Sequence, residues 1–150
     1  MMKHLSENND LPIEVLQTEE AGRLITFDLP ALTHFQEDRP YTQILSDIGT
    51  ARVVLFAFRA GQQLKEHKTS SQILVHVLEG QITFATASNS VEVHEGMIIQ
   101  LEANLEHSLI VKTDAVVLLT LTPSPAQHSL QKELWQDQAP LVKRIAKQKR

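Results

Sequence analysis

The stretch that decides the fold is Gly61–Gly80, with the sequence GQQLKEHKTSSQILVHVLEG. It opens with a glycine turn after an apolar segment, RVVLFAF, and it contains His67. It ends in the apolar run Ile73–Leu78, which is closed by Glu79 and Gly80. A short apolar run that stops at a glycine predicts a buried β-strand followed by a tight hairpin turn.

A second stretch, Gly96–His107 (GMIIQLEANLEH), has a related spacing. Together the two stretches resemble the paired motifs of the cupin family. The first family motif is a glycine, five residues of any type, a histidine, one residue, a second histidine, three or four residues, a glutamate, six residues and a second glycine. The second motif is a glycine, five residues of any type, a proline, one residue, a second glycine, two residues and a histidine. Here Glu102 replaces the proline and Asn104 replaces the second glycine. Asparagine enters the left-handed backbone region readily, so we expect Asn104 to keep the turn.

The resemblance implies a candidate site, and the sequence departs from the family there. In metal-binding cupins the first motif supplies two histidines and a glutamate, and the second supplies another histidine. His67 and His107 stand at the first and last of these positions, whereas Thr69 stands at the second histidine and Ile73 at the glutamate. The resemblance therefore predicts a ligand pocket formed by His67, Thr69, Ile73 and His107. Only His67 and His107 remain as metal ligands.

Strand periodicity predicts how these side chains point. His67, Thr69 and Ile73 have the same parity along the first motif, so we expect them to point together into the barrel, towards His107. Two imidazoles alone would hold a divalent ion (zinc, nickel, manganese or iron) weakly, unless water, Gln72, Thr69 or a substrate completed the shell. Two interpretations stay open: a weakly held metal ion, or two histidines that line a polar pocket or bond to the backbone.

Composition limits the chemistry of this chain of 150 residues. The absence of cysteine rules out disulfide bonds, thiolate metal sites and a cysteine nucleophile. Five of the 14 basic residues lie in the last eight positions, so residues 1–142 carry 9 basic and 18 acidic groups, a net charge of −9. An acidic body argues against nucleic-acid binding on the barrel. The apolar runs are too short to cross a membrane and no signal peptide is visible, which predicts a cytoplasmic protein.

Three regions are expected along the chain: an N-terminal arm at residues 1–49, a cupin barrel at 50–122 and a C-terminal tail at 123–150. Short strands separated by glycine turns predict an all-β barrel, and the cupin motifs specify a double-stranded β-helix of the jelly-roll type. In the arm, strands are predicted at Ile13–Gln17 and Arg23–Phe27.

Short helices are predicted at both ends of the barrel. Asp28 is expected to cap a helix with Pro30 in its first turn, and this helix should bury Leu32 and Phe35 and end before Pro40. In the tail, helical spacing is seen for Leu130, Leu134 and Trp135, and a second helix is predicted to start at Pro140 and to include Leu141, Val142 and Ile145.

The predicted function is binding of a small molecule in the barrel, with or without a weakly held metal ion. The alternative is a metal-dependent enzyme, of the dioxygenase or isomerase type, that uses His67 and His107. The resemblance also implies a homodimer, in which Tyr41–Ile48 and the N-terminal arm would cover exposed sheet edges across a two-fold axis.

Overall fold

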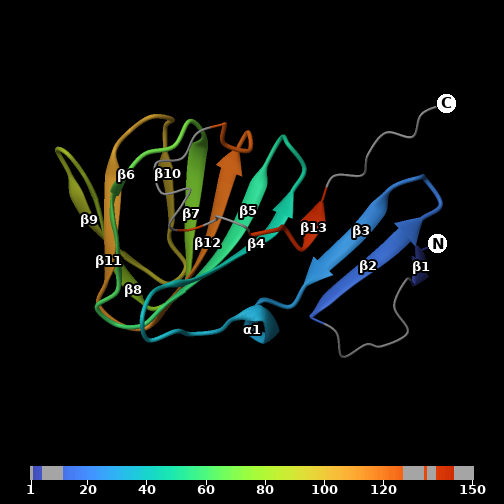
Figure 1. Ribbon diagram of the computed structural model, residues 1–150, viewed down its shortest axis with the longest axis horizontal. Coiled ribbons are helices and arrows are strands. Elements are labelled where there is room, and N and C mark those ends of the chain that lie inside the picture. Colours follow the sequence, from blue (N-terminus) through green and yellow to red (C-terminus); the bar gives the residue numbers. More distant parts are fainter. Residues whose placement is uncertain (1, 5–11, 127–133, 135–137, 144–150) are drawn as a thin grey trace. The chain divides into compact units, whose positions relative to one another are not determined.

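A computed structural model describes residues 2–4, 12–126, 134 and 138–143 of the chain (Figure 1). It divides the chain into two compact units, Met1–Thr33 and His34–Arg150. The barrel was expected to start at residue 50. It starts earlier, because Tyr41–Asp47, which was expected in the N-terminal arm, forms a strand of the larger barrel sheet.

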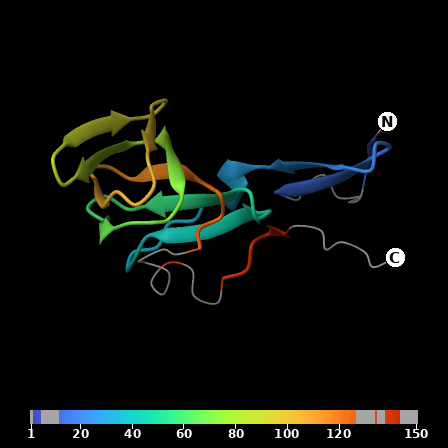
Figure 2. The same ribbon diagram turned by 90° about the horizontal axis from the view of Figure 1, so that it is seen from above.

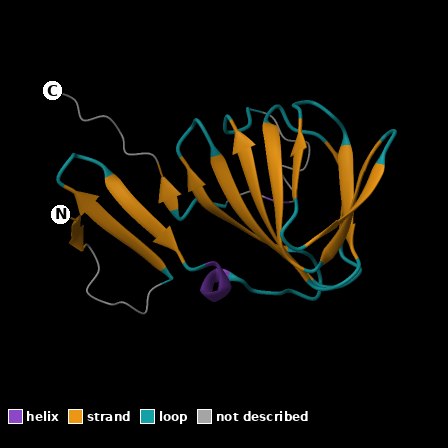
Figure 3. Ribbon diagram, turned by 180° about the vertical axis from the view of Figure 1, so that it is seen from behind, coloured by secondary structure: helices purple, strands orange, loops and turns teal. Residues whose placement is uncertain are grey.

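The first unit is a three-stranded antiparallel sheet with the strand order β1-β2-β3. Its strands are Met2–His4 (β1), Ile13–Thr18 (β2) and Arg23–Phe27 (β3), and the last two match the predicted strands. Strands make up most of both units (Figure 3).

Helix α1, Leu29–Leu32, begins as predicted and ends earlier than predicted. The Asp28 carboxylate accepts a hydrogen bond from the backbone N–H of Ala31, and Pro30 lies in the first turn. The helix stops after one turn because Thr33 adopts an extended conformation while its hydroxyl donates to the carbonyl of Leu29. Phe35, expected on the buried face of this helix, therefore lies outside it. In the second unit the guanidinium carbon of Arg59 lies 4.7 Å from the centroid of the Phe35 ring.

The second unit contains two sheets (Figure 1, Figure 2). The larger has the order β10-β7-β12-β5-β4-β13 and is formed by Tyr41–Asp47 (β4), Arg52–Phe58 (β5), Gln72–Glu79 (β7), Ile98–Leu101 (β10), Ala115–Thr122 (β12) and Val142–Lys143 (β13). The smaller has the order β6-β11-β8-β9 and is formed by Gln63–His67 (β6), Gln81–Thr86 (β8), Ser90–His94 (β9) and His107–Val111 (β11). All pairings are antiparallel except that of β13 with β4. The predicted double-sheet jelly roll is confirmed.

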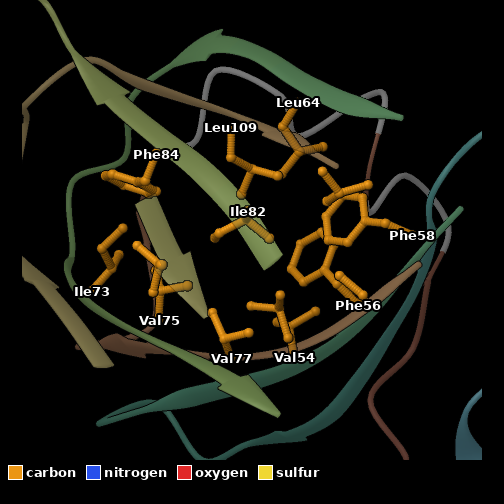
Figure 4. Packing of buried hydrophobic residues seen from close by; sticks show 14 of the residues in the cluster. Val54, Phe56, Phe58, Leu64, Ile73, Val75, Val77, Ile82, Phe84 and Leu109 are labelled. Carbon is orange, nitrogen blue, oxygen red and sulfur yellow. The ribbon is translucent and has the colours of Figure 1, made fainter. Parts of the chain in front are cut away.

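The core lies between these two sheets, where alternate residues of each strand point inward (Figure 4). On β5, Val54, Phe56 and Phe58 belong to the core cluster, and the rings of Phe56 and Phe58 stack with centroids 5.6 Å apart. The smaller sheet contributes residues such as Ile82 and Phe84 from β8. Burial of this many large apolar side chains is the main stabilising contribution to the barrel.

The C-terminal residues pair with the edge of the larger sheet. Val142 and Lys143 pair in parallel with Ser46 and Asp47 of β4, and the N–H of Leu141 donates to the carbonyl of Ile44. The helix predicted to start at Pro140 is therefore wrong at these residues, because the edge of β4 offers backbone hydrogen bonds to an extended chain. Leu130, Trp135 and Ile145, also predicted to be helical, lie outside the described residues.

Several turns have a left-handed backbone, and Gly80, Asn104 and Gly61 lie in three of them. Gly80 (φ 84°) joins β7 to β8, and Asn104 (φ 66°) lies in the turn before β11, as predicted from the replacement of glycine by asparagine. A Cβ atom at Gly80 would collide with the backbone of Asp114 and Ala115. Gly61 also has a left-handed backbone (φ 87°), but nothing lies within 4 Å of its missing Cβ.

These two glycines give a matched test of the fold. Gly61→Ala should lower the free energy of unfolding by about 1–2 kcal/mol, the cost of a left-handed backbone for a residue with a Cβ atom. Gly80→Ala should cost about 1–3 kcal/mol more, because the new methyl group also meets fixed backbone atoms. Urea unfolding of both variants measures the difference, and equal costs would show that the turn at Gly80 relaxes.

Candidate functional site

Two buried histidines face each other on neighbouring strands. His67 is the last residue of β6, His107 is the first residue of β11, and the two are direct partners in the antiparallel pairing. Their ring centroids lie 4.2 Å apart with the planes at 60°. Only 6% of His67 and 5% of His107 is exposed to solvent. The convergence of His67 and His107 inside the barrel is what the two motifs predicted.

The backbone fixes both rings in the same way. The Nδ1 atom of His67 lies 2.6 Å from the carbonyl oxygen of Lys65, and Nδ1 of His107 lies 2.8 Å from the carbonyl oxygen of Leu105. A carbonyl oxygen only accepts hydrogen bonds, so each Nδ1 carries the proton. In the neutral ring the lone pair is therefore on Nε2. In this tautomer Nε2 can accept a hydrogen bond or coordinate a metal ion.

Burial keeps both rings neutral. Loss of hydration and, secondarily, the neighbouring His107 lower the pKa of His67 to about 4, against an opposing effect of the hydrogen bond to the Lys65 carbonyl. Burial also lowers the pKa of His107. Near pH 7 the pair therefore presents basic nitrogen atoms and no charge.

The two imidazoles line a small apolar cavity of about 30 Å³. The other wall residues are all apolar: Phe56, Phe58, Leu64, Ile73, Val75, Phe84, Leu109, Val117, Leu119 and Leu134. The ring of Phe84 stacks on His107 with the centroids 5.5 Å apart. A cavity of this size holds one or two water molecules and is roughly ten times smaller than the site of a drug-sized ligand.

The structure brings three of the four predicted pocket residues to this cavity. Ile73 is 2% exposed and belongs to its wall. Thr69 is only 4% exposed but is not part of the cavity wall, and it lies in the connection between β6 and β7. There its carbonyl accepts a hydrogen bond from the N–H of Asn104. Gln72, considered as a further ligand, is exposed at the start of β7.

Sequence reasoning missed Leu134 and the aromatic part of the wall. The inward alternation along β5 and β8 could have identified Phe56, Phe58 and Phe84. No local signal identifies Leu134, which was predicted only as part of a tail helix. Leu134 follows β12 in the sequence, and its contact with the cavity depends on tertiary structure that no local pattern predicts.

Glu66, the residue before His67, lies on a different surface. With Glu106 it lines a hollow of about 180 Å³ to which His107 also contributes. The pKa of the Glu66 carboxyl is raised, because Glu106 shares a hydrogen bond with it and repels its negative charge. Glu66 is not part of the wall of the internal cavity.

The internal cavity does not provide a complete ligand set for a divalent ion. His67 and His107 could supply two nitrogen ligands, but the rest of the cavity wall is hydrocarbon. Among the described residues, no three His, Cys, Asp or Glu side chains are placed so that they could hold an ion. An ion in this cavity would keep its double charge without a carboxylate, which is unfavourable in an apolar interior.

Comparison with known proteins supports the fold. The family model for the cupin domain matches residues 54–122. A cupin superfamily protein from Desulfitobacterium hafniense is 16% identical, with a TM-score of 0.62, over 83% of this chain and 99% of that chain. A protein of unknown function from Streptococcus pyogenes is 20% identical, with a TM-score of 0.61, over 75% of this chain and 96% of that chain.

An RmlC-like cupin protein from Desulfovibrio desulfuricans is 24% identical, with a TM-score of 0.57, over 61% of this chain and 89% of that chain. No curated protein matches the sequence. At these identities the solved structures are similar to this chain in fold alone. Within the described part of the chain, none of the helices has the length and apolar character needed to cross a bilayer.

The buried histidines predict an acid-sensitive fold. Unfolded histidine has a pKa of about 6.5, whereas the pKa of folded His67 is lowered to about 4. Between these values the unfolded state binds more protons, so the free energy of unfolding should fall as the pH is lowered from about 6.5 to about 4. The slope should reach about 1.4 kcal/mol per pH unit for each histidine that stays neutral.

Urea unfolding between about pH 7 and pH 4.5 measures this dependence in the parent, in His67→Leu and in His107→Leu. Each of these two variants should lose part of the pH dependence of the free energy of unfolding. His94→Leu, at an exposed position on β9, should behave like the parent. Identical pH dependence in all four proteins would show that the pair is not responsible.

Proposed function

This chain is a small protein with a cupin domain at residues 54–122, and we propose that it binds a small, mainly apolar organic molecule inside the barrel. The observation that carries this proposal is the pair of buried, neutral imidazoles in an otherwise apolar cavity. Stability alone does not explain two histidines at these positions, because burial of an imidazole costs hydration that an aliphatic side chain would not lose.

The tautomer selects the polar group of the ligand. With Nδ1 committed to backbone carbonyls, His67 and His107 offer Nε2 lone pairs, which accept hydrogen bonds. A hydroxyl or an N–H group supplies the matching donor. A carboxylate supplies only lone pairs and would also lose its hydration without gaining a counter-charge. The proposed ligand is therefore an apolar molecule with an alcohol group or a neutral N–H group such as an amide.

Three probes of similar shape test this selection. Benzyl alcohol has a hydroxyl donor, toluene has none, and benzoate is an anion without a donor. Ligand-observed NMR near pH 7 should rank benzyl alcohol above toluene, with no binding of benzoate. In His67→Leu and His107→Leu the advantage of benzyl alcohol over toluene should vanish. His76→Leu is the control, because His76 lies on β7 between the inward-facing Val75 and Val77 and so faces the other side of that sheet.

The outcome that contradicts the proposal is equally specific. It is wrong if benzyl alcohol binds no better than toluene, or if both histidine variants keep the parent preference.

A weakly held divalent ion is the second candidate, and one observation favours it. Both rings are held through Nδ1 by a backbone carbonyl, which is the usual support of a metal-ligating histidine. If the missing carboxylate limits affinity, Ile73→Glu should bind zinc, nickel, manganese or iron much more tightly than the parent. Val75→Glu is the matched control, because Val75 lies on the same strand and lines the same cavity.

Calorimetry with each ion measures the gain, and unfolding should show a loss of stability from the buried carboxylate in both variants. Equal affinity in Ile73→Glu and Val75→Glu would mean that position 73 does not complete a site. If none of these ions changes the melting temperature of the parent protein, the metal-binding hypothesis is wrong and the organic ligand remains as the proposal.

The homodimer stays a prediction, and we propose β10 as its edge. The outer edge of β4 already pairs with β13 of the same chain. In the described residues β10 pairs only with β7, and its Ile98 is 60% exposed. Ile98→Lys should therefore produce a monomer by light scattering, because a charge at a free edge opposes strand pairing. Val91→Lys, at an equally apolar exposed position on β9, should leave the dimer intact. A monomeric parent would contradict the prediction.

A further inference from the structure

We propose that a β-bulge at Lys65 and Glu66 decides which ring nitrogen of His67 carries the proton, and thereby selects the polar group of the ligand. Where it concerns the ligand, the inference rests on the proposed function, because it refers to the same cavity. Where it concerns His67 itself, it stands on the geometry of β6 alone.

The bulge is visible in the pairing of β6 with β11. His67 on β6 is opposite His107 on β11. Leu64 is opposite Leu109, so residues 64 to 67 of one strand span the same distance as residues 107 to 109 of the other. Leu64 and His67 are buried, whereas the two residues between them are both exposed. One of these two is therefore the additional residue of a β-bulge.

Regular alternation would not bring both inward-facing side chains of β6 to the interior. In a regular strand, residues 64 and 67 point to opposite faces of the sheet. Leu64 and Leu109 lie together in the barrel interior (Figure 4), and His67 lines the cavity with them. The bulge thus allows β6 to place the imidazole in the cavity wall while Leu64 stays in the core.

The bulge also supplies the hydrogen-bond acceptor for the ring. Nδ1 of His67 lies 2.6 Å from the carbonyl oxygen of Lys65, two residues earlier. In a regular strand the carbonyl groups lie in the plane of the sheet and the side chains stand perpendicular to it, so these two groups would not meet. His107 makes the equivalent bond to Leu105, and there the backbone is also irregular, because Leu105 follows the left-handed Asn104.

The Lys65 carbonyl determines what His67 can recognise. Neutral histidine in water has its proton mainly on Nε2, whereas a carbonyl partner at Nδ1 requires the proton on Nδ1. With the proton on Nδ1, Nε2 accepts a hydrogen bond from a ligand hydroxyl. With the proton on Nε2, the same atom would donate, and an ether or carbonyl oxygen would suit it better. The bulge therefore makes the site selective for donors.

Deletion of Glu66 tests this role, because it leaves two residues of β6 opposite two of β11. Regular alternation then keeps His67 inside and opposite His107, but without the carbonyl acceptor. Nitrogen-15 NMR of the histidine rings in the full-length protein distinguishes the two tautomers at neutral pH. In the parent, both rings should carry the proton on Nδ1. In the deletion variant, His67 should shift towards the Nε2-protonated form. His107, whose acceptor is Leu105, should stay unchanged as the internal reference.

The matched controls are Lys65→Ala and Glu66→Ala, which remove the exposed side chains of the bulge and keep its backbone. Both should show the parent tautomer at His67. A tautomer shift in either of them as large as that in the deletion variant would overturn the inference.

A second variant changes one acceptor and removes no residue. Replacement of Glu66 by its α-hydroxy acid turns the Lys65 carbonyl into an ester carbonyl, which is a weaker acceptor. His67 should shift in the same direction as in the deletion variant, but less. The same replacement of Lys65 weakens the Leu64 carbonyl instead and should leave His67 unchanged. This pair decides the question if deletion of Glu66 prevents folding. A His67 ring that stays protonated on Nδ1 in every backbone variant that folds would overturn the inference.

Ligand selectivity is read from two probes of similar shape. Benzyl alcohol has a hydroxyl donor, whereas anisole has only an ether oxygen. The affinity ratio of benzyl alcohol to anisole should fall about two- to tenfold in the deletion variant, which corresponds to one hydrogen bond of about 0.5–1.4 kcal/mol. An unchanged ratio with a changed His67 tautomer would show that the bulge does not select the ligand. If neither probe binds to the parent, the proposed function fails, and the NMR spectra still decide whether the bulge fixes the tautomer.

Discussion

The antiparallel pairing of β6 with β11 is the constraint on which the site depends. It places His67 directly opposite His107. At the far end of the pair, Gly61 donates to the carbonyl of Val111, and Val111 donates to the carbonyl of Gln62. Because side chains alternate between faces, a slip of one residue would move a histidine to the outside of the barrel. The turns that fix this register therefore also fix the chemistry of the interior.

The aliphatic residue at position 73 leaves the barrel interior without a negative charge. A carboxylate there would need a cation, so that site and ion would stabilise each other. With Ile73 in the wall, every group that faces the cavity is neutral near pH 7. The backbone carbonyls of Lys65 and Leu105 accept hydrogen bonds from the ring N–H groups, which offsets the part of the burial cost that comes from Nδ1. The histidine pair is thus compatible with a closed apolar core.

The sequence predicted the barrel, its strands and the histidine pair, because each has a local signal. Alternation and glycine turns mark the strands, Asp28 marks a helix start, and Asn104 can replace a glycine because both tolerate a left-handed backbone. What failed depends either on contacts between distant segments or on a local hydrogen bond that the sequence pattern does not mark. Thr33 ends helix α1 through its own hydroxyl, and Val142 joins a strand that lies almost a hundred residues earlier in the chain. Thr69 is buried, as the alternation from His67 to Ile73 predicted, but parity alone could not show that it lies outside the cavity wall.

Stability and ligand binding compete for the same space in this barrel. Phe56, Phe58 and Phe84 are core residues and cavity wall at once, so any room for a ligand reduces the packing that holds the two sheets together. Close-packed interiors lose free energy for each void that opens without refilling. A ligand in this cavity would therefore have to replace the contacts that these aromatic side chains now make with one another and with the rest of the core.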